Sequence, residues 1–375
     1  MAENKLASIH SATEAALCLS LVPGIGPRVY ADLVQAFGSP AEVLDAEPAK
    51  LREVPGVGAK LLREIATAKE SSNVQEQLEI CQKNEIKILE RGGKSYPERL
   101  NEIYDPPSIL FAQGNFLAAD NLGIAIVGSR HASNYGTKVA EQLARGLAMA
   151  GMTIVSGLAR GIDAAAHRGA LHAGGRTIAV LGGGLLKMYP PEHDVLAQEI
   201  KNQGAVVTES LPLSAPKTGS FPRRNRIVTG LSLGVIVVEA GERSGALISA
   251  RLAMEQGREV FAVPGRIDNR MSRGCHRLLR DGAKLVESVD DVLEELGPMA
   301  SEVAVGEEKL IRRPAELKLT EQESKVLNAI RTDATEFDDI IELTELPPAR
   351  VLSTISVLEM KKLVRRVSGT SLVRI

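Results

Sequence analysis

Residues 123–168, GIAIVGSRHASNYGTKVAEQLARGLAMAGMTIVSGLARGIDAAAHR, decide how this chain folds. They contain two short apolar runs, 124–127 and 152–155, each followed by a glycine-containing turn and then a helical pattern. In the first helical pattern Val139, Leu143 and Leu147 recur at the spacing of one helix face. Strand, turn and helix repeated twice form the unit from which parallel β-sheets are built.

The turns after the two apolar runs predict an anion-binding edge. They read Gly128-Ser129-Arg130 and Ser156-Gly157, and both follow the carboxyl ends of predicted strands. Ligands of open α/β sheets bind beyond those ends. Glycine lets backbone N–H groups approach a ligand, the N-terminus of the next helix favours an anion, and Arg130 adds a fork suited to phosphate.

The same alternation continues through residues 121–297. The further predicted strands are rich in Val, Ile and Ala, as strands covered on both faces are. They fall at 177–181, 205–208, 234–238, 259–263 and 284–286, and a last helix covers about 289–296. We therefore predict an α/β fold, an extended Rossmann-like, doubly wound parallel sheet.

Composition excludes several classes of protein. The chain has 375 residues, a net charge of −2 and 44% hydrophobic residues, which is ordinary for a globular protein of several domains. Its cysteines, Cys18, Cys81 and Cys275, have no paired spacing, so we expect no disulfide framework, no metal site and a reducing, cytoplasmic location. There is no signal-peptide pattern, and no apolar run reaches the roughly 18 residues of a membrane span, so no membrane association is expected.

Smaller modules are predicted on both sides of the sheet. Residues 11–70 are predicted to be helical, and the repeated turns at 21–27 and 54–60 resemble the hairpins of a helix-hairpin-helix (SAM-like) domain, which is expected at 1–70. Exposed N–H groups of such a hairpin, with Arg28 or Lys60 beside them, can hold a nucleic-acid phosphate; the alternative is that the pair only packs. Residues 71–120 are read as a connector with a helix at 74–83 and edge strands at 86–89 and 109–111, its prolines keeping the rest extended.

The C-terminal part is predicted to be a winged helix after a linker at 298–317. Thr320 and Glu323 form a capping-box signature at the start of a first helix. A second helix is expected at 337–343, a third from Pro347 to Lys362, and a β-hairpin at 363–367 and 371–375. Three helices and a hairpin over 318–375 are typical of a winged-helix domain.

The strongest charged cluster is the run Phe221-Pro222-Arg223-Arg224-Asn225-Arg226. Residues 211–230 contain four basic and no acidic side chains, a local charge of +4 in a chain of net −2. The run follows one predicted strand and enters a helix, so it lies on the same sheet edge as Arg130. Arginines at a helix N-terminus predict a polyanion site, and Phe221 can stack a base. The alternative is a solvated basic helix start with Phe221 in the core.

Nucleotide-binding and catalytic signatures are weak. The first turn lacks GxGxxG and the chain lacks a phosphate-loop spacing, which disfavours a dinucleotide or nucleoside triphosphate site. Asp163 and His167 lie four residues apart and could act as an acid/base pair, but no nucleophile pattern accompanies them. We favour a role in orienting the 157–161 loop by hydrogen bonds. The run 239–245 follows another strand and is read as an anion-cradling loop, with a simple tight turn as the alternative.

Together these stretches resemble the DprA (Smf) family, DNA-processing proteins of bacterial natural transformation. The matching residues keep the family's order and spacing over about 120–297: GSR at 128–130, SGLARGID at 156–163 with His167, YPPEH at 189–193, FPRRNRIVTGLS at 221–232, VVEAGERSGALISA at 237–250 and FAVPG at 261–265. The resemblance implies a non-enzymatic, cofactor-free homodimer that binds and protects incoming single-stranded DNA. It also implies loading of the RecA recombinase, on strands coated by single-strand-binding protein.

The resemblance and the basic pattern together predict the site. The expected single-stranded DNA-binding residues come from the predicted turns and the basic helix start: Gly128, Ser129, Arg130, Gly157, Arg160, Gly161, Lys187, Phe221, Arg223, Arg224, Asn225, Arg226, Ser244 and Gly245. One departure matters: after the glycines 182–184 the family usually has Leu-Asp, whereas in this chain Leu185 is followed by Leu186 and Lys187. A role for a carboxylate there is therefore in doubt, and Lys187 could add charge to the DNA surface.

Two other functions are open to the same sequence. One is a nucleotide-processing hydrolase of the lysine-decarboxylase-like class, whose PGGxGTxxE pattern would align with residues 240–249; Ser249 stands where that chemistry needs a glutamate. The other is a transcription regulator led by the winged helix, whose third helix carries Arg350, Lys361 and Lys362 but also Glu359.

Overall fold

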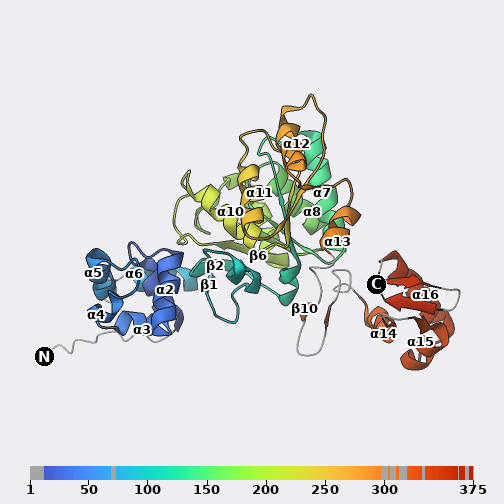
Figure 1. Ribbon diagram of the computed structural model, residues 1–375, viewed down its shortest axis with the longest axis horizontal. Helices are drawn as coiled ribbons and strands as arrows, with labels where there is room; N and C mark the ends of the chain where they lie inside the picture. Colours follow the sequence, from blue (N-terminus) through green and yellow to red (C-terminus); the bar gives the residue numbers. More distant parts are fainter. Residues whose placement is uncertain are drawn as a thin grey trace.

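The computed structural model describes residues 12–68, 73–296, 303–304, 310–311, 319–331, 334–361, 363–367 and 371–374. Figure 1 shows a helical N-terminal part, a central α/β part and a C-terminal part of helices and short strands. Among the described residues, no helix combines the length and the apolar character that a membrane crossing requires. All three cysteines are buried free thiols.

The N-terminal part confirms the predicted internal repeat. Its helices are α1 (Ala12–Leu21), α2 (Pro27–Phe37), α3 (Pro40–Asp45), α4 (Pro48–Leu51), α5 (Ala59–Ala68) and α6 (Asn73–Lys83). The turns before α2 and α5 are equivalent, because Gly24 and Gly56 both adopt a left-handed backbone, with φ of 98° and 88°. Residues 1–11 and 69–70 of the predicted domain lie outside the described residues.

The central part is built on one nine-stranded sheet in the order β1-β2-β6-β5-β4-β3-β7-β8-β9. The seven strands β3 to β9 are parallel to one another, whereas β1 and β2 add an antiparallel edge next to β6. The bounds agree with the sequence prediction to within a few residues: β1 (Lys87–Glu90), β2 (Ile109–Gly114), β3 (Gly123–Val127), β4 (Thr153–Ser156), β5 (Thr177–Val180), β6 (Gly204–Thr208), β7 (Gly234–Val237), β8 (Glu259–Ala262) and β9 (Lys284–Leu285).

Helices cover both faces of this sheet (Figure 1), which confirms the doubly wound α/β fold. Ile124 and Ile126 of β3 pack with one helical layer, and Ala125 and Val127 pack with the other, as period-2 alternation requires. The first layer contains α7 (Asn134–Met149), α8 (Ile162–His172), α9 (Asp194–Gln203) and α13 (Val289–Leu296). The second contains α10 (Ser220–Gly230), α11 (Gly245–Glu255) and α12 (Arg273–Arg280).

The path of the chain reverses direction at the centre of the sheet. From β3 the chain moves outward through β4, β5 and β6, and α10 then returns it to β7 on the other side of β3. The loops after β3 and β7 therefore lead to opposite faces at neighbouring strand ends. This is the topological switch point at which ligands of such sheets bind.

The connector differs from the prediction, since its prolines do not keep it extended throughout. A 3₁₀ helix, η1 (Glu98–Glu102), lies between them, and three more occur as η2 (Ala118–Leu122), η3 (Pro191–His193) and η4 (Arg270–Ser272). Leu100 and Ile103 pack against Gly230 at the end of α10, where even a Cβ would lie 2.8 Å from either side chain. Burial of these two apolar residues explains why the segment coils rather than extends.

The C-terminal part has its own core and the predicted order of helices and hairpin. Its elements are α14 (Glu321–Ala329), β12 (Thr335–Glu336), α15 (Phe337–Thr344), α16 (Pro348–Met360), β13 (Val364–Arg366) and β14 (Ser371–Arg374). The capping box is confirmed: Glu323 N donates to Thr320 Oγ1 at 3.2 Å, and Thr320 N donates to Glu323 Oε2 at 2.6 Å. The sequence did not reveal β12, which adds a third strand beside β14.

The predicted linker at 298–317 lies mostly outside the described residues. Its described residues form two short strands, β10 (Val303–Ala304) and β11 (Leu310–Ile311), which pair antiparallel. Two-residue strands give too little periodicity to be recognised in a sequence.

Candidate nucleic-acid interface

The loops after β3 and β4 pack directly against each other. Ser129 N donates to Glu239 O at 2.8 Å, and Ile162 N donates to Ser129 O at 3.2 Å. Gly161 has φ of 74°, and a Cβ there would lie 2.2 Å from Ser129 O. The glycine is therefore required for this close approach, which fixes the start of α8 beside the Gly128-Ser129-Arg130 turn.

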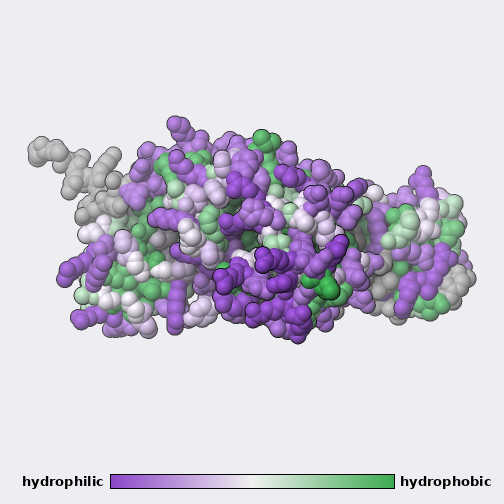
Figure 2. Space-filling view, turned by 90° about the horizontal axis from the view of Figure 1, so that it is seen from above, coloured by the Kyte–Doolittle hydropathy of each residue, from purple (hydrophilic) through white to green (hydrophobic). Residues whose placement is uncertain are grey.

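A pocket of about 740 Å³ opens at the predicted sheet edge. Its walls come from the loops after β3, β4 and β7 and from the first turns of α10 and α11, that is, from both sides of the switch point. The predicted site residues in its lining are Gly128, Ser129, Arg130, Gly157, Phe221, Arg224, Asn225, Ser244 and Gly245. Figure 2, which looks onto the molecule from above, shows mostly hydrophilic side chains over the central part.

Phe221 lines the wall of this pocket and is partly buried. It is therefore neither a fully exposed stacking residue nor a core residue, the two alternatives that the sequence offered. The guanidinium carbon of Arg130 lies over its ring, 5.0 Å from the centroid. The ring also meets Gly182, where a Cβ would lie 2.9 Å from Phe221 Cδ1. The glycine thus seats the aromatic ring at the sheet edge, next to a cation.

Arg224 is buried beneath the pocket, with 5% of its surface exposed. Its Nη1 donates to two backbone carbonyls, Gly157 O and Val180 O. Any side chain at residue 157 would collide with it, because a Cβ there would lie 2.4 Å from Nη1. Burial lowers the pKa of Arg224, and the nearby Asp163 opposes that shift. Arg224 therefore supplies a positive charge of fixed position at the pocket floor.

Asp163 and His167 occupy different surroundings. Asp163 Oδ2 accepts a hydrogen bond from Ala159 N at 3.3 Å, so it does contact the 157–161 loop. Burial raises the pKa of Asp163, while Arg224, the backbone N–H groups of Ala159 and Gly157, and Arg130 act in the opposite direction. His167 differs from the prediction: it is fully buried, and its Nδ1 lies 2.7 Å from Thr177 Oγ1 on β5 rather than bonding the loop.

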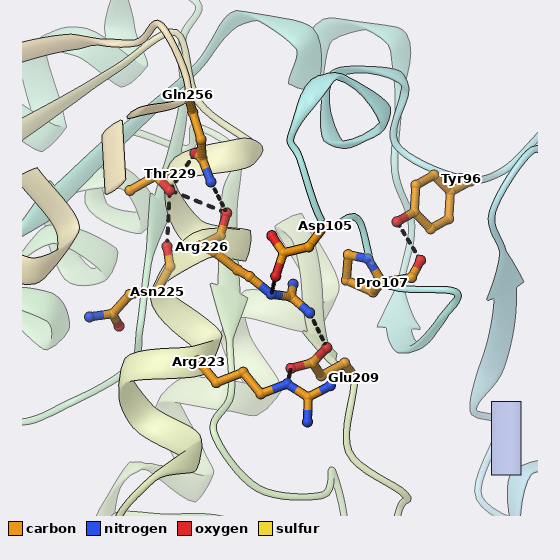
Figure 3. A network of polar contacts seen from close by, with 9 residues as sticks. All are labelled: Tyr96, Asp105, Pro107, Glu209, Arg223, Asn225, Arg226, Thr229 and Gln256. Atoms are coloured by element: carbon orange, nitrogen blue, oxygen red, sulfur yellow. Dashed lines mark hydrogen bonds and ion pairs between the residues drawn. The ribbon is translucent and has the colours of Figure 1, made fainter. Parts of the chain in front are cut away.

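Arg226 lies outside the pocket, contrary to the placement expected from the sequence (Figure 3). Its guanidinium makes ion pairs with Asp105 at 2.9 Å and with Glu209 at 2.5 Å, and its side chain is only 6% exposed. Arg223 pairs with the same Glu209 at 2.9 Å but keeps 60% of its side chain exposed. Two of the four basic side chains in residues 211–230 are thus paired with carboxylates.

Three further predicted residues lie around the rim or beyond it. Arg160 forms an exposed ion pair with Glu192 at 2.6 Å, and Gly161 shapes the loop without lining the pocket. Lys187 is exposed and does not line it either. Arg243, which the sequence reading did not single out, is exposed and lines the pocket. Its position inside the 239–245 motif was the signal that could have identified it.

The 239–245 loop divides into two functions. Glu239 is buried and accepts hydrogen bonds from Ser133 N at 2.8 Å and Ser133 Oγ at 2.6 Å, so it ties the loop to the start of α7. Ser244 caps α11 by accepting from Ala246 N at 3.3 Å. The loop lines the pocket through Gly241 and residues 243–245. Ser249 also lines it, so a hydroxyl occupies the position where the hydrolase pattern needs a carboxylate.

Comparison with known proteins gives matches to three family models along the chain. A SAM-like helix-hairpin-helix tandem matches residues 17–68, DNA recombination-mediator protein A matches 87–297, and a DprA winged helix domain matches 311–370. Protein Smf of Synechocystis is 34% identical, over 94% of this chain and 96% of its own length.

Two solved structures are similar to this chain. The X-ray structure of DNA processing protein A from Streptococcus pneumoniae superposes with a TM-score of 0.67 at 36% identity, covering 77% of this chain and 99% of that one. DNA processing protein A from Helicobacter pylori, described for its single-stranded DNA binding mode, has a TM-score of 0.51 at 33% identity, covering 56% and 95%.

Proposed function

This chain belongs to the family of DNA recombination-mediator protein A, the DprA or Smf proteins, and we propose that it binds single-stranded DNA in the pocket around Phe221. The observation that carries the proposal is Arg130 lying over the Phe221 ring, with its guanidinium carbon 5.0 Å from the centroid. An aromatic ring and a phosphate-binding cation are thus in contact at the sheet edge. This combination suits a flexible single strand, whose bases are free to stack.

Backbone donors and buried charge add to this surface. Arg224 holds a positive charge at the pocket floor, Arg243 extends charge to the rim, and the N-terminus of α10 points to the same edge. The related protein of Helicobacter pylori is described as binding single-stranded DNA, which favours the same ligand here.

The proposed cellular role is DNA processing in natural transformation. We propose that the chain acts as a homodimer, protects incoming single strands and helps RecA to assemble on strands coated by single-strand-binding protein. This role needs no cofactor and no covalent chemistry, and the pocket offers charge, backbone donors and an aromatic ring for it. The helix-hairpin-helix and winged-helix modules are proposed to flank this central DNA-binding domain.

The binding proposal is tested with fluorescently labelled oligonucleotides of equal length. Anisotropy titrations should give tighter binding of a single strand than of the duplex, and affinity should fall as salt rises because phosphates are neutralised. Equal or tighter binding of the duplex would overturn the proposal that the pocket selects single strands.

A second experiment separates DNA handling from the hydrolase alternative. RecA filament formation on coated single strands is measured with and without the protein, beside an assay for release of free base from nucleoside monophosphates. We expect faster filament formation and no base release, since Ser249 occupies the glutamate position. Base release that disappears in an Asp163→Asn variant, without any effect on RecA, would favour the hydrolase.

A further inference from the structure

A second aromatic ring lies beside Phe221 in the proposed DNA pocket. Tyr189 is 42% exposed, its ring centroid is 5.7 Å from that of Phe221, and the two planes are tilted by 51°. The chain contains six Phe, five Tyr and no Trp. In so aromatic-poor a chain, two partly exposed rings in contact at a basic pocket form a distinctive pair of stacking surfaces.

The position of Tyr189 is held by the segment that follows it. His193, at the end of η3, is 6% exposed, and its Nδ1 lies 2.9 Å from Leu158 O. Glu192 of the same turn pairs with Arg160 at 2.6 Å. Both contacts attach residues 189–193 to the loop after β4. The buried contact of His193 with Leu158 O does not depend on Arg160, so it keeps the ring of Tyr189 in place next to Phe221.

Each ring has an arginine of its own. The guanidinium carbon of Arg130 is 5.0 Å from the Phe221 centroid, and that of Arg160 is 5.9 Å from the Tyr189 centroid. A small cavity is lined by both rings and both arginines. The ion pair of Arg160 with Glu192 is exposed on both sides, and such pairs contribute little, so Arg160 can exchange it for a phosphate.

We propose that Tyr189 and Arg160 form a second nucleotide subsite next to the one formed by Phe221 and Arg130. The base of the neighbouring nucleotide stacks on Tyr189, and Arg160 contacts a phosphate of that nucleotide. The inference rests on the proposed function and deepens it, because it defines at least two adjacent nucleotides that are bound through their bases. Any base can stack, so the subsite selects single strands rather than a sequence.

Substitution of Tyr189 gives the first test, with binding of a short oligothymidylate as the readout. Tyr189→Ala should weaken binding about tenfold, the loss of one stacked base, whereas Tyr189→Phe should bind like wild type because the ring remains. Tyr104→Ala is the matched control, since Tyr104 is 80% exposed and lies against Arg28, away from the pocket. Equal affinity of Tyr189→Ala and wild type would overturn the subsite.

Tyrosine emission offers an independent readout, because the chain contains no Trp. Stacking of a base should quench emission of the wild-type protein when oligothymidylate binds, and Tyr189→Phe should lose most of that quenching at unchanged affinity. Quenching of the same size in both proteins would contradict stacking on Tyr189.

The two levels of proposal fail in different ways. If wild type does not bind single strands, the proposed function fails and the subsite fails with it. If Phe221→Ala weakens binding but Tyr189→Ala does not, only the subsite is overturned. Oligonucleotides that lack one base or two adjacent bases give a further comparison. The subsite predicts that wild type binds the second oligonucleotide more weakly than the first, and that Tyr189→Ala binds both equally.

Discussion

Arg226 Nη2 lies 2.5 Å from Glu209 Oε2, and this ion pair joins α10 to the end of β6. The same helix carries Phe221 and Arg224 into the pocket, while Arg226 points away from it toward Asp105 (Figure 3). Gln256 Nε2, at the C-cap of α11, also donates to Arg226 O at 3.1 Å. The basic run therefore has two roles: Phe221 and Arg224 line the proposed DNA pocket, and Arg226 fixes the helix.

Arg226→Ala should lower the free energy of unfolding by about 3 kcal/mol, because it leaves the carboxylate of Glu209 largely buried without this partner. Urea denaturation measures the change. Arg223→Ala is the control: it contacts the same Glu209 but is 60% exposed, so a loss below about 1 kcal/mol is expected. Weakened DNA binding by Arg226→Ala at unchanged stability would contradict a structural role.

Arg130→Ala should weaken binding of single strands and reduce its dependence on salt. Each lost phosphate contact should make the slope of log affinity against log salt shallower by about 0.7. Titrations at several salt concentrations give the slope. Arg251→Ala serves as control, since Arg251 is an exposed arginine that does not line the pocket; equal slopes for both variants would mean that Arg130 does not contact DNA.

Phe221→Ala should cost about 1–3 kcal/mol of binding free energy, as expected for one stacked base. The ring is only partly buried, so the melting temperature should change little. Anisotropy and thermal unfolding of the same preparation provide both values. A large drop in melting temperature with affinity retained would assign the ring to the core instead.

Gly157→Ala should impair DNA binding by displacing the side chain of Arg224. Its Cβ would lie 2.4 Å from Arg224 Nη1, so the guanidinium has to leave its place beneath the pocket. We expect both lower affinity and lower stability, because a buried charge loses its carbonyl partners. Gly58→Ala is the control for the loss of stability, since no atom lies within 4 Å of a Cβ there. Wild-type affinity of Gly157→Ala would show that this position of Arg224 is not needed.

The free energy of unfolding should decrease as the pH is lowered below neutrality, because His167 is buried in its neutral form. Burial, reinforced by His193 and Arg224, lowers its pKa from 6.5 to about 3, so the unfolded chain binds the proton first. The stabilisation by neutral His167 is complete above pH 6.5 and is lost progressively as pH falls toward 3. At pH 5 the loss in the free energy of unfolding should be about 2 kcal/mol.

A variant at this position tests the assignment. Thr177 Oγ1 donates to Ile154 O, so it accepts from His167 Nδ1, and Asn can supply the same donor. His167→Asn should therefore fold and lose this part of the pH dependence in urea titrations at pH 7 and pH 5. An unchanged difference between the two pH values would assign it to other groups.

The sequence predicted the sheet and the edge that carries the pocket because both depend on local patterns. Apolar runs such as 124–127, glycine turns and helical spacing recur within short windows, and the order of strands along the chain places their carboxyl ends together. The position of Phe221 beside Arg130 follows from that logic. The 3₁₀ helix η1 and strand β12 could not be predicted in this way. Burial against the distant end of α10 stabilises η1, and pairing with the distant strand β14 stabilises β12.

The sequence by itself determined the α/β class, the strand order in the chain and the loops that meet at the pocket. Only the tertiary structure decided which arginines remain available there. Glu209 lies just outside the basic window 211–230, and Asp105 is more than a hundred residues from Arg226, yet both neutralise it. Charge pairing and burial act through space, so counting charges along the chain overstated the free positive charge of α10, and only folding revealed Tyr189 and Arg160 beside Phe221.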